Sequence, residues 1–313
     1  MQKFQKIKSY ENEKMFEDKL ANNGKEVITI EPTDSLIITE KMDGSNASVT
    51  IEDGKLVSYS HNCKLDENKT LNGFYGFINS IPNLNNLPEK YILFGEWLTP
   101  HRIVYKPECY NKWYLFDLFD KENNEFLGYK AAQKVFVDLK LDEYDILMAP
   151  LLEDEITNIT FNDLPRAQEA YSEKSDNSVR GNMEGIVVSD LSKTVPTSET
   201  TTGPLRVKLV NAVFKETKQL PKDSINVSEW LNANITLPRI SKKILEMQDE
   251  DNIKNEKPNF GWMHNGYSHK IALEVLIDAL EESPELPAEL KQVLQVSKSQ
   301  TNKFIALTAK DLI

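Results

Sequence analysis

The chain has 313 residues, of which 40% are hydrophobic and 27% charged, a balance typical of a globular protein with a buried core. Its formal net charge is −12, from 49 acidic and 37 basic residues, so any nucleic acid must be bound by a local basic site and not by a generally basic surface. Its two cysteines form no CxxC pair and no stretch approaches the roughly 20 apolar residues of a membrane span, so we expect a cytoplasmic protein (host cytoplasm if viral).

The first half of the chain has the pattern of a sheet that follows a short polar helix. Residues 1–24 have a helical pattern that ends at Asn22-Asn23-Gly24. Short β-branched and alternating runs then predict strands over 27–30, 36–39, 47–51, 56–59, 91–97, 113–119, 185–188 and 205–210, with one helix over 129–140. Asp53-Gly54 predicts a hairpin turn, and the Thr/Ser-rich run 194–203 predicts a mobile loop.

After about residue 220 the apolar residues recur at helical spacing, in the runs 240–245, 271–277 and 289–294. The polar stretch 248–258 between them predicts an exposed loop. Three basic residues fall on the first of these helices, either as a solvated face or as a nucleic-acid patch: Arg239, Lys242 and Lys243. We therefore predict an α+β chain with two domains, a mainly sheet domain over 1–215 and a helical domain over 220–313.

Lys41 is the first candidate for chemistry, because it ends a predicted strand and precedes Asp43-Gly44. Taken alone, this segment could be an ordinary hairpin turn with a solvated lysine. A lysine amine that attacks a phosphate must be neutral, so its pKa must fall, and nearby cations or a metal lower it. The rest of the chain must then supply charge neutralisation, a platform for a base and contacts to a sugar.

Later segments supply residues of these kinds. Arg206 and Lys208 lie two apart on a predicted strand, so they share a face and could bind phosphate. Glu96 ends an apolar strand and could bind hydroxyls, Phe116 could stack on a purine, and Glu184 could hold a metal. Each also has an ordinary alternative: a solvent-facing basic pair, a strand-end carboxylate or a core phenylalanine.

In this order the segments resemble five motifs of the covalent nucleotidyltransferases, which are the polynucleotide ligases and the mRNA capping enzymes. The resemblance covers about residues 34–211. The matching segments are Lys41–Gly44 for motif I, Phe94–Glu96 for motif III, Tyr114–Asp117 for motif IIIa, Met183–Val188 for motif IV and Leu205–Lys208 for motif V.

Within that superfamily the chain resembles the RNA ligase 2 family. The run Gly44-Ser45-Asn46 and the opening Phe4–Asn12 are both similar to that family, whereas many DNA ligases carry arginine at the position of Asn46. DNA ligases and capping enzymes usually add a β-barrel with an RxDK-like motif, and no RxDK follows residue 212. The resemblance therefore implies an adenylation domain built on antiparallel sheets, followed by a helical domain.

The resemblance implies an ATP-dependent RNA ligase, which forms a lysyl–AMP bond on Lys41 and joins 3′-hydroxyl and 5′-phosphate ends with the help of Mg²⁺ or Mn²⁺. It implies RNA ends or a nicked duplex as the substrate of a monomer without membrane contact. The roles it implies are adenine contacts for Glu40 and Phe116, a ribose contact for Glu96, a metal-bound water or phosphate for Asn46, the metal for Glu184, and the α-phosphate for Arg206 and Lys208.

The chain also departs from the family pattern. An arginine usual on the strand after motif I is replaced by the segment 60–64, so His61 or Lys64 would have to bind the RNA end. His101 and Arg102 follow motif III, and we interpret them as a surface loop in preference to phosphate contacts. The alternatives that stay open are a minimal DNA ligase, a capping guanylyltransferase and a non-catalytic nucleic-acid-binding relative.

Overall fold

The computed structural model describes residues 2–5, 7–10, 36–156, 164–165, 168, 175–198, 200–211, 233–250, 252–282 and 290–310. The chain divides into two compact units, Met1–Asn211 and Ala212–Ile313. The predicted strand 27–30 and the predicted boundary at 215–220 lie outside the described residues. Within the predicted N-terminal helix, residues 8 and 9 instead form a short strand, β1 (Lys8–Ser9), so the helix prediction is wrong there.

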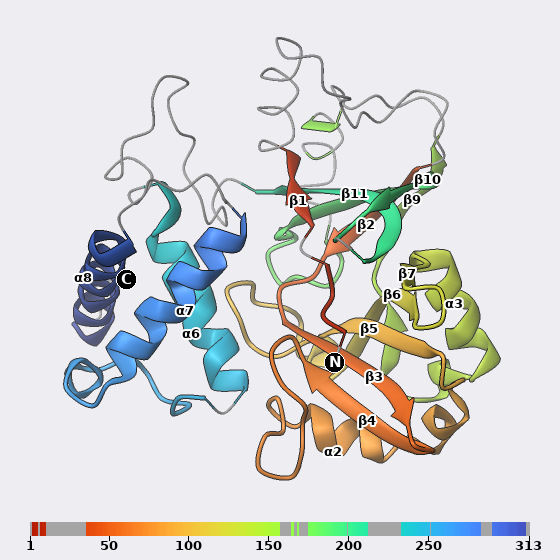
Figure 1. The fold of residues 1–313 in the computed structure, drawn as a ribbon, viewed down its shortest axis with the longest axis horizontal. Coiled ribbons are helices and arrows are strands. Elements are labelled where there is room, and N and C mark those ends of the chain that lie inside the picture. The colour runs from red at the N-terminus through yellow and green to blue at the C-terminus, as the bar shows by residue number, and fades with distance from the viewer. Residues whose placement is uncertain are drawn as a thin grey trace. The chain divides into compact units, whose positions relative to one another are not determined.

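Among the described residues of the first unit, eleven strands form one sheet, in the order β4-β3-β5-β6-β7-β11-β10-β2-β9, with β1 beside β11 and β8 beside β6 (Figure 1). The bounds are β2 Leu36–Lys41, β3 Ser45–Glu52, β4 Lys55–Ser60, β5 Tyr91–Trp97, β6 Trp113–Asp120, β7 Glu125–Phe126, β8 Ile146–Met148, β9 Leu151–Ile156, β10 Gly185–Pro196 and β11 Thr202–Val210. The sheet and the helices confirm the predicted α+β class.

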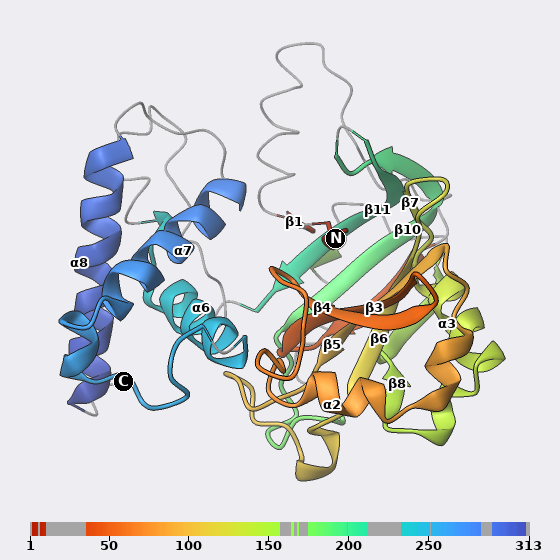
Figure 2. The ribbon, with the colours of Figure 1, turned by 60° about the horizontal axis from the view of Figure 1, so that its bottom comes forward.

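The two-residue strand β7 divides the sheet into two halves. In the first half, β4-β3-β5-β6, one face packs with α2 (Phe74–Asn79) and α3 (Tyr129–Asp138) in a single apolar core. Figure 2 shows both helices flanking these strands. Ala47, Val49 and Leu93 point into that core. Because side chains alternate along a strand, Asn46, Ser48, Thr50, Ile92, Phe94 and Glu96 lie on the opposite face, which we call the first inner face.

The second half, β11-β10-β2-β9, alternates in the same way. Ile38, Val188 and Val207 belong to its separate apolar core. Along β2, β10 and β11, the residues that alternate with these core residues point to the opposite face, which we call the second inner face. They are Ile37, Thr39, Lys41, Val187, Ser189, Arg206 and Lys208. The two inner faces meet, because Arg206 forms an ion pair of 2.6 Å with Asp117 of β6 and Ile37 packs with Phe116.

A β-bulge sets the direction of Phe116. Phe94 pairs with Asp117, but Gly95 pairs with Leu115, so Phe116 is an extra residue in β6. A bulge of this kind bends the strand and re-aims a side chain. Consequently Asp117 contacts Arg206, and Phe116 packs in clusters with the inner-face residues Phe94 and Ile37.

Short helical turns complete the first unit at Pro82–Asn86, Pro107–Cys109 and Leu141–Glu143. The predicted mobile loop 194–203 is instead the end of a hairpin, in which Pro196 pairs with Thr202 and the Thr197 amide donates to the Thr201 carbonyl at 2.9 Å. The loop prediction is therefore wrong for residues 194–196 and 202–203, which belong to the paired strands. Within the turn, the Thr201 hydroxyl contacts the hydroxyls of Thr197 and Ser198, each at 2.7 Å.

The described residues of the second unit form α6 (Leu237–Asp249), α7 (Tyr267–Glu282) and α8 (Leu290–Ala309), with a short turn at Phe260–Met263. Its core forms around Trp262, which is fully buried. The Thr236 side chain accepts from the Arg239 amide and so caps α6. None of the helices in the described ranges is both long and apolar enough to span a bilayer.

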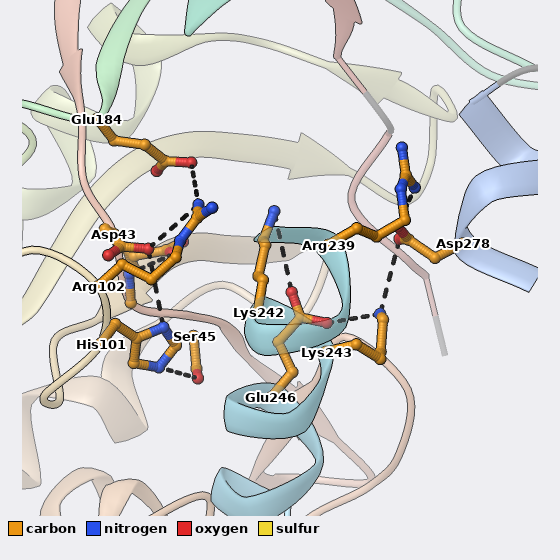
Figure 3. A network of polar contacts seen from close by, with 12 residues as sticks. Asp43, Ser45, His101, Arg102, Glu184, Arg239, Lys242, Lys243, Glu246 and Asp278 are labelled. Atoms are coloured by element: carbon orange, nitrogen blue, oxygen red, sulfur yellow. Dashed lines mark hydrogen bonds and ion pairs between the residues drawn. The ribbon is translucent and has the colours of Figure 1, made fainter. Parts of the chain in front are cut away.

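The basic residues of α6 are mostly paired within this unit (Figure 3). Arg239 is buried and forms an ion pair with Asp278 of α7, and Lys243 contacts both Glu246 and Asp278. The expected solvated face is therefore wrong for Arg239, because a carboxylate on the neighbouring helix compensates its buried charge.

Gly95 pairs with β6 at the bulge, where the close approach of β6 leaves no room for a Cβ atom. A Cβ atom there would lie 2.5 Å from Trp113 Nε1 and 2.8 Å from the Tyr114 carbonyl oxygen. Gly95→Ala should therefore destabilise the protein by about 1–3 kcal/mol through overpacking. The exposed Gly76 in α2, with nothing within 4 Å of its added Cβ, is the matched control. Gly76→Ala should instead stabilise by about 0.5–1 kcal/mol, and thermal unfolding of both variants measures the difference in sign.

Candidate active site

The strand pairing brings Lys41 and Glu184 together. Lys41 ends β2 and pairs with Gly185, the first residue of β10, so Glu184 lies directly beside the lysine. Lys41 Nζ donates to Glu184 Oε2 at 2.6 Å, and the two side chains are 20% and 1% exposed. On its other side, Gly185 permits the close approach of β11, since a Cβ atom there would lie 2.1 Å from the Leu209 carbonyl oxygen.

A second cation holds the other oxygen of Glu184. Arg102 Nη2 donates to Glu184 Oε1 at 3.2 Å and lies 3.8 Å from Asp43 Oδ1 (Figure 3). A buried carboxylate is costly unless charge and hydrogen bonds compensate it. Here Lys41 supplies one positive charge and Arg102 the other.

Asp43 joins the motif I segment to the segment that follows β5. Its Oδ2 accepts from the Ile103 amide at 2.9 Å, and its own amide donates to the Tyr105 hydroxyl at 2.9 Å. His101 lies between Asp43, with Nδ1 3.8 Å from Oδ1, and Ser45, with Nε2 3.5 Å from Oγ. Residues 101–105 are therefore folded onto the turn after Lys41.

The surface-loop interpretation of His101 and Arg102 is thus wrong. Their side chains are 1% and 11% exposed, and both lie beside Asp43. Asp43 and Arg102 were not among the predicted site residues. The burial of Arg102 could not be predicted, because an irregular loop has no periodicity from which burial follows. The available signal was a basic pair shortly after Glu96, and its meaning depended on the loop folding back.

Glu96 lies on the first inner face, in register with Asn46 on the neighbouring strand. Its Oε1 accepts from the Gly44 amide at 3.1 Å. Burial raises the pKa of Glu96 to about 7; the Lys41 charge opposes this rise and the Glu184 charge adds to it. Glu96, Lys41 and Glu184 are therefore near enough to interact electrostatically, and the ribose contact predicted for Glu96 remains a prediction.

The side chain of Glu40 is committed to a different contact. It is buried, and its two oxygens accept from Ser175 Oγ at 2.6 Å and from Asn177 Nδ2 at 3.5 Å. Burial raises the pKa of Glu40, while the hydrogen bond from Ser175 opposes the rise. The side chain thus anchors the segment that begins at Ser175, and an adenine contact from Glu40 remains a prediction.

Arg206 and Phe116 lie further along the inner faces. The Arg206 guanidinium contacts Asp117, whose Oδ1 also accepts from the Leu118 and Gly128 amides, each at 2.8 Å. Burial raises the pKa of Asp117, and the Arg206 charge opposes the rise. Lys208 is partly buried and pairs with Val187 across the strands, on the same face as Arg206. The phosphate contacts predicted for both residues remain predictions.

The predicted RNA-binding residues lie just after β4. Lys64 is exposed, contacts Glu52 at 3.5 Å and lies 5.9 Å from the centre of the Tyr59 ring. His61 is partly buried in the turn between Ser60 and Lys64. The contact with RNA predicted for both residues remains a prediction.

The carboxylates of the site, Glu184 and Glu96, fit a metal ion that is bound together with a nucleotide. Within the part of the chain that the structure describes, no group of three or more His, Cys, Asp or Glu side chains could hold a metal ion by itself. Mg²⁺ at phosphoryl-transfer sites is usually held by one or two carboxylates together with substrate phosphates. Glu184, with Glu96 near it, meets that requirement.

The sheet thus places Lys41, at the end of β2, beside the buried carboxylate that precedes β10. The chain matches the RNA ligase family over residues 34–210 and belongs to that family. No curated protein sequence matches it.

Among solved structures, the fold is similar to RNA ligase from Naegleria gruberi. One mutant of that enzyme with ATP and Mn is 18% identical with a TM-score of 0.47, and another with AMP and Mn is 17% identical with a TM-score of 0.45. The same enzyme with PPi is 18% identical with a TM-score of 0.44. Each match covers 68% of this chain and 57% of the other, so this chain spans little more than half of that length.

The raised pKa of Glu96 gives a pH dependence of stability. In the absence of nucleotide and metal, Glu96→Gln should stabilise the protein relative to wild type at about pH 8 but not at about pH 5. The folded-state pKa of about 7 lies above the ordinary glutamate pKa of 4.5. Between these two pKa values, wild type binds a proton at Glu96 when it folds, so its stability falls as the pH rises through this range. The glutamine side chain does not titrate, so the variant lacks this loss.

Denaturant unfolding of both proteins across this range measures the effect. A stability difference that stays constant with pH would show that Glu96 is not desolvated in the folded protein.

Proposed function

We propose that the chain is an ATP-dependent RNA ligase that joins 3′-hydroxyl and 5′-phosphate ends through a covalent lysyl–AMP bond on Lys41. The observation that carries this proposal is the 2.6 Å contact between Lys41 Nζ and the buried Glu184, in a chain of the RNA ligase family. The proposed nucleotide and metal are ATP with Mg²⁺ or Mn²⁺; ATP and Mn are also the ligands in one Naegleria structure.

In the first step, the Lys41 amine attacks the α-phosphate of ATP. A bond forms between Nζ and phosphorus, and the bond to the departing pyrophosphate breaks. Glu184 Oε2 lies within hydrogen-bonding distance of Nζ and can take its proton. Arg102, on the other oxygen of Glu184, keeps that carboxylate in place.

The remaining inner-face residues hold the nucleotide in this proposal. Phe116 and Glu40 contact adenine, Glu96 binds ribose, and Asn46 positions a phosphate or a metal-bound water. Lys208 and Arg206 contact the α-phosphate, with Arg206 oriented by Asp117 at 2.6 Å. Glu184 would hold a divalent ion together with the phosphates, and that ion would supply charge neutralisation for the leaving pyrophosphate.

The adenylyl group then passes to a 5′-phosphate end, and a 3′-hydroxyl attacks that end with release of AMP. His61 and Lys64 are the proposed contacts to the RNA end. Because the net charge is −12, RNA must be attracted by the basic residues around Lys41 and not by the whole surface. We further propose a monomer in the cytoplasm, where the free thiols of Cys63 and Cys109 stay reduced.

Covalent labelling tests the first step. With ATP labelled at the α-phosphate and Mg²⁺ or Mn²⁺, wild type should acquire label and Lys41→Ala should not. Glu184→Gln should slow labelling by about 100-fold, since it removes the proton acceptor. Lys55→Ala, on the exposed start of β4, is the matched lysine control and should label like wild type.

An unlabelled wild type, or a labelled Lys41→Ala variant, would overturn the proposal. Labelling by GTP in place of ATP would indicate a capping guanylyltransferase.

Strand sealing tests the choice of RNA. Nicked duplexes with ribonucleotides on the 3′-hydroxyl side should be sealed at least about tenfold faster than all-DNA nicks, a difference of about 1.4 kcal/mol in the barrier. Equal or faster sealing of DNA nicks would indicate a minimal DNA ligase. RNA binding without either adenylylation or sealing would indicate a non-catalytic relative.

A further inference from the structure

The residues before β1 place an aromatic side chain between the two halves of the sheet. The Phe4 ring centre lies 4.9 Å from that of Phe116, 5.4 Å from that of Phe94 and 5.4 Å from that of Phe126. Its contacts to Phe116 and Phe126 are edge-to-face, a geometry favoured by the charge distribution of aromatic rings. Phe4 is therefore packed against the first half of the sheet.

Phe4 also contacts the second half. The guanidinium carbon of Arg206 lies 5.8 Å from the centre of the Phe4 ring and 6.0 Å from that of Phe126. A guanidinium within about 6 Å of a ring face is attracted to it. Arg206 is thus held from two sides, by the Asp117 carboxylate at 2.6 Å and by these two rings.

Strand alternation puts these contacts on the inner faces. Phe94 precedes Glu96 by two residues, so both side chains lie on one face of β5. Arg206 precedes Lys208 by two residues on β11 in the same way. The Phe4 ring therefore contacts Phe94, the neighbour of Glu96 on this face of β5, and it also contacts Phe116.

Backbone pairing fixes the position of the N-terminal segment. β1 pairs in parallel with β11, with Lys8 opposite Val207 and Ser9 opposite Lys208. Lys8 follows Phe4 by four residue steps, which limits their distance to about 14 Å even in an extended chain. Figure 1 shows this segment, in dark red, running from β1 toward the strands of the first half.

We propose that Phe4 is a positioning residue of the nucleotide site. It fixes the ring of Phe116 and the guanidinium of Arg206, and so helps to set the affinity for ATP. This inference rests on the proposed function, because it assigns those two residues to adenine and phosphate.

The test is the apparent KM for ATP in the labelling reaction. Phe4→Ala and Phe4→Leu should raise KM by about 3- to 10-fold, the range expected for losing an aromatic pair. The maximal labelling rate should change by less than about twofold, since Lys41 and Glu184 are untouched. Phe4→Tyr keeps the ring and should restore most of the affinity.

Phe136 provides the matched control. It lies on α3, is partly buried, and packs against the core on the other face of the sheet. Phe136→Ala should lower the melting temperature without changing the KM for ATP. If its KM rises as much as that of Phe4→Ala, loss of packing alone explains the effect and the proposal is overturned.

Equilibrium binding of ATP with Mn²⁺ separates this proposal from the chemistry of ligation. If wild type binds ATP but is never labelled, the ligase proposal fails, while weaker binding by Phe4→Ala still supports the positioning role. Unchanged or tighter binding by Phe4→Ala contradicts that role, and tighter binding would show that Phe4 obstructs the nucleotide. If wild type does not bind ATP, both proposals fail.

Discussion

The site depends on one buried carboxylate that holds two cations. Glu184 accepts from Lys41 on one oxygen and from Arg102 on the other, and it is 1% exposed. Removing either cation would leave a buried charge without full compensation, which is expensive in a low-dielectric interior. The contact also orients the lysine amine, because the strand that begins at Gly185 fixes where the carboxylate lies.

The wider architecture keeps that contact in place. Pairing of β10 with β2 sets Glu184 beside Lys41, and Asp43 ties the segment carrying Arg102 to the motif I turn. The bulge in β6 directs Phe116 to the inner faces, where the Phe4 ring packs against it and the Arg206 guanidinium lies near the Phe4 ring. The same few strands therefore place both the proposed nucleophile and the proposed nucleotide contacts.

Much of this arrangement was predictable, because it depends on local pattern. The apolar run 91–97 is the strand β5, and alternation correctly put Arg206 and Lys208 on one face. Arg102 was not predictable, since its burial depends on a loop folding back onto Asp43. Arg239 was misjudged for a similar reason: its partner Asp278 lies on another helix, far along the chain.

The most direct test of the central claim is to map the adenylylated residue. After reaction with ATP and Mg²⁺, digestion and tandem mass spectrometry should place AMP on the peptide that contains Lys41, on the side-chain nitrogen. Modification of Lys208, of Lys64 or of any other residue instead would contradict the account, because the contact with Glu184 would then not mark the nucleophile.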